Sequence, residues 1–515
     1  MYDIRGKQEY IYRSNKLKEI VGGSAVIRDC FKDFLYPAAK EYRNSINKTG
    51  DLEAIFNYKT EKSDTDFDRK KFEERMDGNQ YIGEVVYDGG GNFFVLYKND
   101  KVCREVNKIF TRKILKKTYS LKVLCTFIDN IDFDDYKNDR DRLYKEHSIR
   151  EASEPNEIPT QVLPFTQVDR MTSMPLYKKY KEIENQEAIK MSKEKYFKYK
   201  KYDEIKTEEK NIFGETLLDN LITKKGEESL LAVVYIDGNN MGAQIQDCLH
   251  GMKSYEKCVA EMRSFSEKIQ KNYVDSGMKA IDKMLDEKYN DCTKRRFVIY
   301  AGDEINFICN ARDAYAAAKT YLKNLPQKDS ACAGIAIFHS HAPYAEAYKI
   351  AEECCESGKT KMKKLGIKNA SLIDFHYCQS GIEIDLETIR NIETNGKTSK
   401  PWFISDINIT DKAANEQYIS TEIAEAMAKE LNNMARTNVK SLASHAKDSI
   451  PSLKMEIKRI EAHSKNKIKF DFYLEKLLKD DKLNDEEVSR LIYDIITVYD
   501  LWFDDNKERS AEIAE

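Results

Sequence analysis

Three acidic residues stand where strands are expected to end or turn, and their side chains could hold metal ions. Asp237 closes an apolar run, LLAVVYIDG, and Asp303 and Glu304 occupy the middle of RRFVIYAGDEINFIC, which is typical of a hairpin. Carboxylate oxygens are hard ligands that suit Mg²⁺ or Mn²⁺, ions that also bind substrate phosphates. Two such ions would stabilise the attacking and leaving oxygens of an in-line displacement at phosphorus. The three acids therefore predict chemistry on a phosphate ester.

The turn after Asp237 could bind phosphates through its backbone. Gly238 and Gly242 flank Asn239, Asn240 and Met241 at the point where the strand passes into a helix. Backbone N–H groups at such a turn can face a triphosphate.

Two lysines on a later helix are further candidates for phosphate contacts. Lys361 and Lys363 lie in SGKTKMKK, near the end of the helix that follows the fourth strand. Cations near a helix C-terminus are also favoured by the helix dipole, so the pattern is equally consistent with a purely structural role.

The elements around these residues must bring them together. Residues 229–380 alternate strand and helix patterns in the order βαββαβ, followed by a further helix and strand. That order predicts an antiparallel-centred sheet with helices on one face, the ferredoxin-like or palm arrangement. The strands bearing Asp237 and Asp303 are then neighbours, so we expect their carboxylates at one edge of the sheet.

The first 130 residues repeat this pattern without the acids. In the first half, YDIRG at 2–6 is followed by YDGGGNFF at 87–94. These two segments correspond to YIDGNNMG at 235–242 and YAGDEINF at 300–307 in the second half. We interpret this as an internal duplication. The turn at 89–91 is all glycine, so this half cannot assemble the same metal site. Gly90 there permits a close backbone approach that suits a second nucleotide, or it only closes a tight hairpin.

The remaining segments are helical and charged. Residues 131–228 form a charged insert that includes KEKYFKYKKYDE, which we interpret as a solvated helical face in preference to a nucleic acid groove because acidic residues interleave the lysines. Residues 381–515 have a helical period. The predicted fold class is α+β: two palm domains (βαββαβ) at 1–130 and 229–380, a helical insert at 131–228 and a helical C-terminal domain at 381–515.

Composition limits the possible partners. Lys and Arg total 85 against 88 Asp and Glu, so no whole-chain field draws nucleic acid, strong intrinsic nucleic acid binding is not expected, and any such contact must be local. The longest apolar run, at 230–236, is far shorter than the ~20 residues of a membrane span, so we expect a cytoplasmic protein with no membrane contact. The 11 cysteines form no CxxC pair, which favours reduced thiols over a zinc site.

These motifs together resemble a known family. YIDGNNMG, YAGDEINF, AGIAIFHS and SGKTKMKK are similar to the second palm of the CRISPR polymerase family, the large subunit of type III CRISPR effectors, and more distantly to GGDEF domains of diguanylate cyclases. DIRGKQEYIY, KLKEIVGGSAVIRD and YDGGGNFF resemble the first palm. The resemblance implies an enzyme of antiviral defence that joins nucleoside triphosphates, usually ATP, into 3′,5′-linked cyclic oligoadenylates, and it implies effector subunits as possible partners.

The resemblance also assigns roles to residues. It implies that Asp237 and Asp303 are metal ligands for two Mg²⁺ or Mn²⁺ ions and that Glu304 is a supporting acid. The nucleotide-binding residues that we expect are Gly238, Asn240, Met241, Gly242, Gly302, Lys361, Gly90 and, in the first palm, Gly22, Gly23 and Ser24.

The chain departs from the family pattern at several positions. Ala301 replaces the usual first glycine of the hairpin turn, Asn239 replaces a common second aspartate, and Glu304 replaces a last aspartate. No His-Asp dipeptide occurs, so the family's frequent nuclease domain is not expected, and LPFTQVDRMTSMP lacks the cysteines that many members carry there. Little of the first palm precedes Asp3, which indicates that the natural start could lie upstream.

Three functions are consistent with these observations. The favoured one is a nucleotidyltransferase and cyclase, stand-alone or within an effector. The second is a catalytically silent subunit of an RNA-guided complex, which the substitutions at Asn239 and Ala301 keep open. The third is a diguanylate cyclase-like enzyme, which is disfavoured because that class pairs two identical catalytic domains.

Overall fold

The computed structural model describes most of the chain, in two compact units. The described residues are 1–14, 16–46, 55–57, 67–77, 81–153, 163–181, 188–213, 221, 229–290, 294–378, 385–404, 419–463 and 483–504. Unit 1 comprises Met1–Glu215, Asn240–Val274 and Val298–Glu304, and unit 2 comprises Thr216–Asn239, Asp275–Phe297 and Ile305–Glu515.

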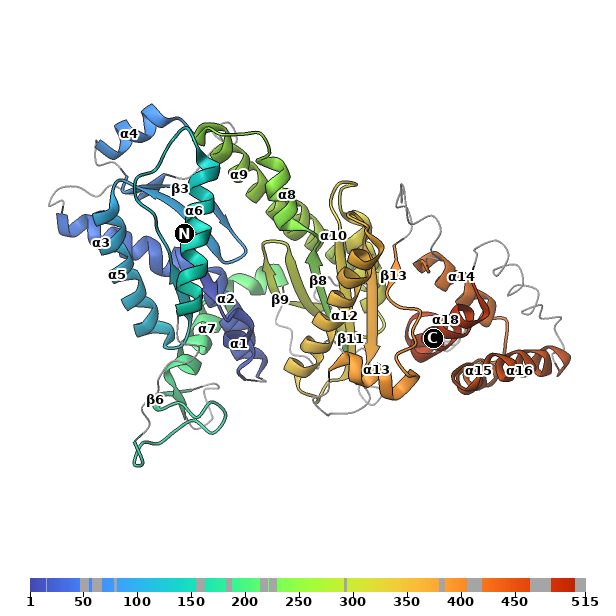
Figure 1. Cartoon of the computed structure of the whole chain (residues 1–515). Coiled ribbons are helices and arrows are strands. Elements are labelled where there is room, and N and C mark those ends of the chain that lie inside the picture. The colour runs from blue at the N-terminus through green and yellow to red at the C-terminus, as the bar shows by residue number, and fades with distance from the viewer. Residues whose placement is uncertain are drawn as a thin grey trace. The chain divides into compact units, whose positions relative to one another are not determined.

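Unit 1 is built on a five-stranded sheet with the order β2-β3-β4-β1-β5 (Figure 1). Its strands are β1 (Tyr2–Arg5), β2 (Phe56–Asn57), β3 (Gly83–Gly89), β4 (Asn92–Tyr97) and β5 (Lys122–Cys125). Helix α5 (Asp100–Thr118) begins where the Asn99 side chain accepts a hydrogen bond from the Val102 amide at 3.0 Å. Its apolar residues enter the same core as β1 and β4, where the rings of Tyr2 and Phe110 pack edge to face at 5.3 Å.

Eight further α-helices surround this sheet within unit 1. They are α1 (Lys7–Tyr12), α2 (Leu17–Arg28), α3 (Tyr36–Ile46), α4 (Arg69–Asp77), α6 (Tyr136–Ser153), α7 (Lys193–Phe213), α8 (Met241–Cys248) and α9 (Tyr255–Ile269). Short π-helical turns connect α2 to α3 at Phe31–Leu35 and follow α9 at Gln270–Asp275.

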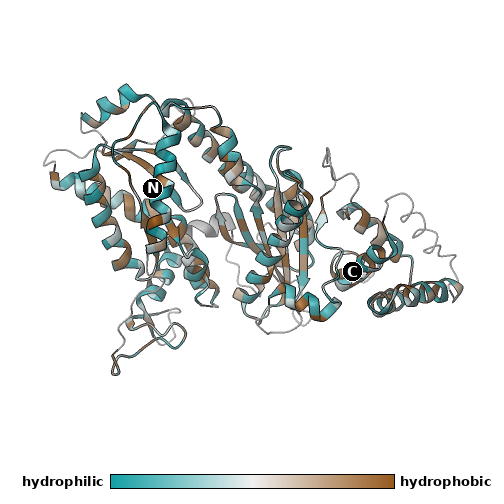
Figure 2. Ribbon diagram, viewed as in Figure 1, coloured by the Kyte–Doolittle hydropathy of each residue, from teal (hydrophilic) through white to brown (hydrophobic). Residues whose placement is uncertain are grey.

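A six-stranded sheet with the order β13-β12-β11-β8-β10-β9 forms the core of unit 2. Its strands are β8 (Leu230–Gly238), β9 (Arg295–Ala301), β10 (Glu304–Asn310), β11 (Ala331–His339), β12 (Leu372–Tyr377) and β13 (Trp402–Phe403). The segment Val298–Glu304, which holds the second half of β9, the turn and the first residue of β10, groups with unit 1. The helices of this region are α10 (Ser276–Tyr289), α11 (Ala314–Asn324), α12 (Tyr344–Leu365) and α13 (Leu386–Thr394). Figure 2 shows hydrophobic residues concentrated in these strands, as expected for a sheet that forms a core.

The two sheets share one topology. In unit 1 the strands β5-β1-β4-β3 have the same order as β11-β8-β10-β9 in unit 2, and both follow the chain order βαββαβ. The predicted fold class, with two palm-like sheets and helical additions, is confirmed. The equal strand order also supports our interpretation of an internal duplication.

Within the described residues, four helices follow the second sheet. They are α14 (Thr421–Leu431), α15 (Arg436–Asp448), α16 (Ile450–His463) and α18 (Asp485–Trp502). A capping box starts α18, because Asn484 and Glu487 each satisfy the other's backbone amide at 2.9 Å.

Helix α7 corrects our interpretation of KEKYFKYKKYDE as a solvated face. Glu194 and Lys198 are 2% and 1% exposed, and the carboxylate of Glu194 accepts from Lys198 at 2.6 Å and from Arg13 at 2.8 Å. The sequence pattern did not predict this burial, because it counts charged residues as exposed, whereas these charges neutralise one another inside unit 1. Before α7 the chain forms a small hairpin, β6 (Leu176–Tyr180) and β7 (Ile189–Ser192), which was not predicted.

Helix α12 lies unusually close to β11, and two glycines permit this. A Cβ atom on Gly334 would stand 1.8 Å from the Ala351 carbonyl oxygen, and one on Gly358 would stand 3.0 Å from Cys332 Sγ. The close contact fixes the position of α12 on the sheet, and with it the lysines that α12 carries.

We expect Gly334→Ala to destabilise unit 2 by about 3 kcal/mol, because the new methyl group meets backbone rather than a movable side chain. Trp402 and Trp502 are the chain's two tryptophans and both lie in unit 2, so tryptophan fluorescence during urea unfolding reports on this unit. The matched control is Lys364→Ala, an alanine substitution at an exposed position of α12 in the same unit. Equal midpoints for the two variants would contradict the packing argument.

None of the helices in the described ranges is both long enough and apolar enough to cross a membrane.

Candidate active site

Two neighbouring strands carry the acidic residues to one edge of the sheet. The Asn306 side-chain amide donates to the Val234 carbonyl at 3.1 Å, and the Ala311 amide donates to the Leu230 carbonyl at 3.3 Å. These contacts pair β10 antiparallel to β8, so the end of β8 and the start of β10 lie at the same edge. Asp237 is the penultimate residue of β8, Glu304 is the first residue of β10, and Asp303 precedes it. The predicted adjacency of the two strands is confirmed, and the roles of the acids stay predictions.

Asp237 has a partner that the sequence did not single out. Its carboxylate forms an ion pair with the Lys359 ammonium on α12, and the two side chains are 24% and 26% exposed. Burial disfavours the charged ammonium, but the Asp237 carboxylate outweighs this effect and holds the pKa of Lys359 above its ordinary value. A positive charge therefore lies directly beside the first acid and remains partly open to solvent.

The predicted phosphate contact, Lys361, has a different environment. Its ammonium donates to the Pro401 carbonyl at 2.8 Å and lies 5.2 Å from the centre of the Phe403 ring. Burial lowers the pKa of Lys361 to about 8. Its role in phosphate binding stays a prediction, and Lys359 is the lysine of α12 that the structure places at Asp237. The sequence signal for Lys359 lay in SGKTK, where Gly358 marks a close contact of α12 with Cys332 of β11.

Two asparagines shape the turn after β8: Asn239 through side-chain hydrogen bonds and Asn240 through its backbone conformation. Asn239 is 3% exposed, and its side-chain amide donates to the Ala370 carbonyl at 2.8 Å and to Ser330 Oγ at 3.2 Å. An aspartate could not donate these bonds, which gives a structural reason for this departure from the family pattern. Asn240 has a left-handed φ of 57° at the start of α8, and a Cβ on Gly242 would meet open space. The predicted phosphate contacts of Gly238, Asn240, Met241 and Gly242 remain untested.

The β9–β10 turn approaches the glycine turn of β3–β4 within unit 1. Gly302 has a φ of +68°, and a Cβ on it would stand 3.0 Å from the Gly90 Cα atom. Ala301 is absent from the positive-φ residues of the described chain, so alanine fits where the family has glycine. The Lys7 ammonium donates to the Gly90 carbonyl.

We expect Gly90→Val to weaken nucleotide joining at least tenfold, because Gly90 has a φ of +58° and its backbone adjoins Gly302. Binding of one labelled nucleoside triphosphate should survive. The control is Gly251→Val, which carries the same backbone strain at a φ of +76°; a Cβ at either glycine would meet no atom within 4 Å, so the comparison isolates the strained backbone that adjoins Gly302. Full joining activity in the Gly90 variant would show that the glycine turn only closes a hairpin.

The predicted first-palm residues lie in a packed helix. Gly22 and Gly23 are on α2, and a Cβ on Gly22 would stand 2.0 Å from the Lys198 carbonyl oxygen of α7. Ser24 is 8% exposed. The structure thus gives these glycines a packing role, and their nucleotide contact stays a prediction.

Asp3, the first-palm counterpart of Asp237, is surrounded by cationic or titratable groups. It is 7% exposed, with Arg5 Nη1 at 2.9 Å and His147 Nε2 at 3.4 Å. The pairing with Arg5 neutralises its charge, in keeping with a half that has lost its acids.

The donor set at the β8 edge fits a hard divalent cation. Within the described part of the chain no three His, Cys, Asp or Glu side chains gather as a metal cluster. Magnesium in phosphate-transferring sites is commonly bound by one or two carboxylates, with water and substrate phosphates completing the shell. Asp237 and Asp303 offer carboxylate oxygens of this kind, with Glu304 beside them.

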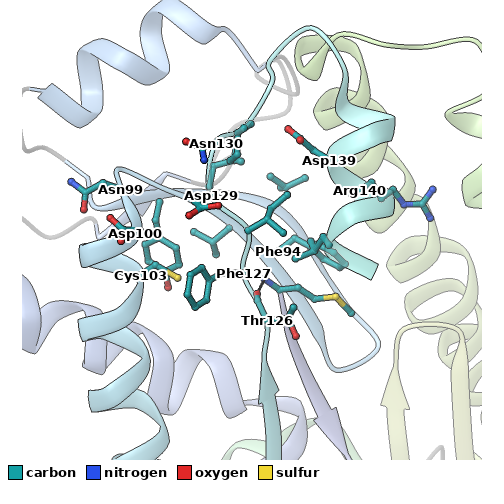
Figure 3. Close-up of a pocket in the computed structure, with 18 of the residues that line it drawn as sticks. Phe94, Asn99, Asp100, Cys103, Thr126, Phe127, Asp129, Asn130, Asp139 and Arg140 are labelled. Carbon is teal, nitrogen blue, oxygen red and sulfur yellow. Dashed lines mark hydrogen bonds between the residues drawn. The ribbon is translucent and has the colours of Figure 1, made fainter. Parts of the chain in front are cut away.

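A separate pocket of about 490 Å³ lies in unit 1, against β4, α6 and the segment that follows β5 (Figure 3). Its walls are mainly apolar, with Phe94 and Phe127 among them, and its lining also includes Asp100 and Asp129. None of the residues predicted from the sequence lines this pocket, so it is no part of the candidate site.

The strand order and the acids at the sheet edge define a palm-type domain in the second half of the chain. Residues 230–370 match the family model for the second palm domain of Cas10/Cmr2, which confirms the predicted resemblance for this segment. No curated protein matches the sequence.

Several solved structures that resemble this chain are Csm1–Csm4 cassettes. The complex with pppApA has 14% identity and a TM-score of 0.42, and the match covers 72% of this chain and 53% of that one. The complexes with pppApApA and with cA4 each have 11% identity and TM-scores of 0.48 and 0.44, covering 97% of this chain and 68% of theirs. The chain thus spans about half the length of the first of these structures.

Proposed function

We propose that the chain is a nucleotidyltransferase that joins nucleoside triphosphates, ATP first among them, into a cyclic oligonucleotide messenger of antiviral defence. The observation that carries this proposal is the position of Asp237 and Asp303 at one edge of a sheet whose sequence matches a Cas10/Cmr2 second palm. Partners of this kind of protein would be the other subunits of a type III CRISPR effector.

In this proposal a 3′-hydroxyl attacks an α-phosphorus and pyrophosphate leaves. Mg²⁺ or Mn²⁺ bound by Asp237 and Asp303 would supply positive charge for the phosphates and lower the pKa of the hydroxyl. Lys359, beside Asp237, provides a fixed cation for a phosphate oxygen. The Asn239 amide donates to the Ser330 carbonyl at 2.9 Å, so the amides that would orient the triphosphate are those that follow it at the start of α8.

The test is incubation of the purified chain with each of the four triphosphates and Mg²⁺ or Mn²⁺, with pyrophosphate as the readout. We expect release with ATP and loss of that release on chelation of the metal. No release with any triphosphate would overturn the proposal and favour the alternative, a catalytically silent palm subunit of an RNA-guided complex.

A further inference from the structure

The hairpin β6–β7 and the start of α7 form a basic surface that the proposed function does not use. The acid and lysine most deeply placed on α7, Glu194 and Lys198, are paired inside unit 1, so they contribute little to the surface charge. Lys178 and Lys179 on β6 and Lys190 on β7 are exposed. On α7 itself Glu194 and Lys198 are buried, so the exposed positive charge comes from the lysines of β6 and β7.

Aromatic rings lie among the exposed lysines. The Lys178 ammonium is 5.3 Å from the centre of the Tyr177 ring and 5.8 Å from that of Tyr196, and the Lys193 ammonium is 5.4 Å from Tyr177. The two tyrosine rings meet edge to face at 5.8 Å. We call these residues, with Lys179 and Lys190, the Tyr–Lys surface.

The Tyr–Lys surface is hollowed where β6 meets the segment before it. A cavity of about 510 Å³ is lined by Lys178, Lys179, Lys190, Tyr177 and Gln167 among others, with no acidic side chain among its described lining residues. Phe165, which adjoins this lining in the chain, is 83% exposed. The hollow combines positive charge with flat apolar rings, and Figure 1 shows its hairpin projecting from the end of α7.

This combination selects a ligand that has both phosphates and accessible rings. Lysines neutralise backbone phosphates, and exposed aromatic rings stack on unpaired bases without regard to sequence. A duplex would present phosphates only, because its bases are stacked and paired. We propose that the Tyr–Lys surface binds single-stranded nucleic acid. The near-neutral net charge of the chain restricts this binding to the local surface.

The sequence next to this surface also contains acids. Glu182, Glu184 and Glu187 fall between β6 and β7, outside the described residues. Their charges oppose a polyanion, so the binding is expected to be salt-sensitive and moderate in strength.

The test uses the full chain without nucleoside triphosphate, so that its outcome is independent of the joining reaction. Fluorescence anisotropy is measured with a labelled 20-nucleotide oligo(U) RNA, the matching oligo(dT) DNA and a blunt duplex, between 50 and 200 mM salt, a range over which phosphate contacts lose much of their affinity. We expect one or both single strands to bind more tightly than the duplex, and the two single-strand arms identify whether RNA or DNA is preferred.

Variants locate the site. K178E/K190E should weaken single-strand binding at least tenfold and flatten the salt dependence, and Y177A should weaken it about tenfold through lost stacking. The matched control K108E/K283E makes the same change in charge at two exposed lysines elsewhere. K178Q/K190Q, which is milder for folding, should weaken binding in the same direction, and circular dichroism checks the fold of each variant. Equal losses in K178E/K190E and the control, equal binding of duplex and single strand, or no binding at 50 mM salt would each overturn the proposal.

Discussion

Asp303→Asn should abolish nucleotide joining, by at least about a thousandfold or ~4 kcal/mol in the barrier, while the fold remains intact. Asp303 lies in the half-exposed turn before β10, where a change from carboxylate to amide contributes little to stability. The carboxylate would bind the metal ions that act on the phosphates, so its removal lowers activity and leaves stability nearly unchanged. Pyrophosphate release measures the activity, and circular dichroism during urea unfolding checks the fold of the whole chain, because Asp303 groups with unit 1 while both tryptophans lie in unit 2. Activity within about tenfold of the parent would contradict the assignment of Asp303 to the metal site.

The second acid provides an internal check on this result. Asp237→Asn should cause a comparable loss, and the double variant should be little worse than either single one, because both acids serve one site. Additive losses would place the two acids in separate roles.

Lys359→Ala should lower kcat/KM for ATP by about 10- to 100-fold, or ~1.4–2.7 kcal/mol. The ammonium is the one that the structure pairs with Asp237, and its removal takes a cation from the place proposed for the phosphates. Because the lysine would also compete with the proposed metal for the Asp237 carboxylate, less Mg²⁺ should be needed for half-maximal activity of the variant.

Two other lysines on the same helix serve as comparisons. Lys361→Ala removes the lysine that donates to the Pro401 carbonyl, and Lys364→Ala removes an exposed one. We expect kcat/KM of Lys364→Ala to be close to that of the parent. The value for Lys361→Ala should lie between those of Lys364→Ala and Lys359→Ala. A larger loss for Lys361 than for Lys359 would restore Lys361 as the main phosphate contact.

The order of strands and helices could be predicted because it depends on local patterns. The apolar run of β8, the turn of the β9–β10 hairpin and the repeat in the first half each leave a periodic or glycine signal in the sequence. The adjacency of strands β8 and β10 then follows from the βαββαβ topology.

The choice of lysine could not be predicted in the same way. The side of α12 that faces Asp237 is set by the close packing of the helix on β11 at Gly334. The sequence alone does not show how close this packing is. The burial of α7 was also missed, because hydropathy counts Glu194 and Lys198 as solvent-facing when each in fact neutralises the other. Likewise, the glycines of α2 suggested a nucleotide contact, and their close packing on α7 became visible only in three dimensions.

The most direct test of the central claim is mass analysis of the products formed from ATP with Mg²⁺ or Mn²⁺. We expect cyclic oligoadenylates, which have no terminal phosphate and a mass that is a whole number of adenylate units, and one pyrophosphate released for each linkage. The product should be absent with the Asp237→Asn/Asp303→Asn variant. Unchanged ATP, or equal product from the parent and this double variant, would contradict the claim that the edge of the second sheet joins nucleotides.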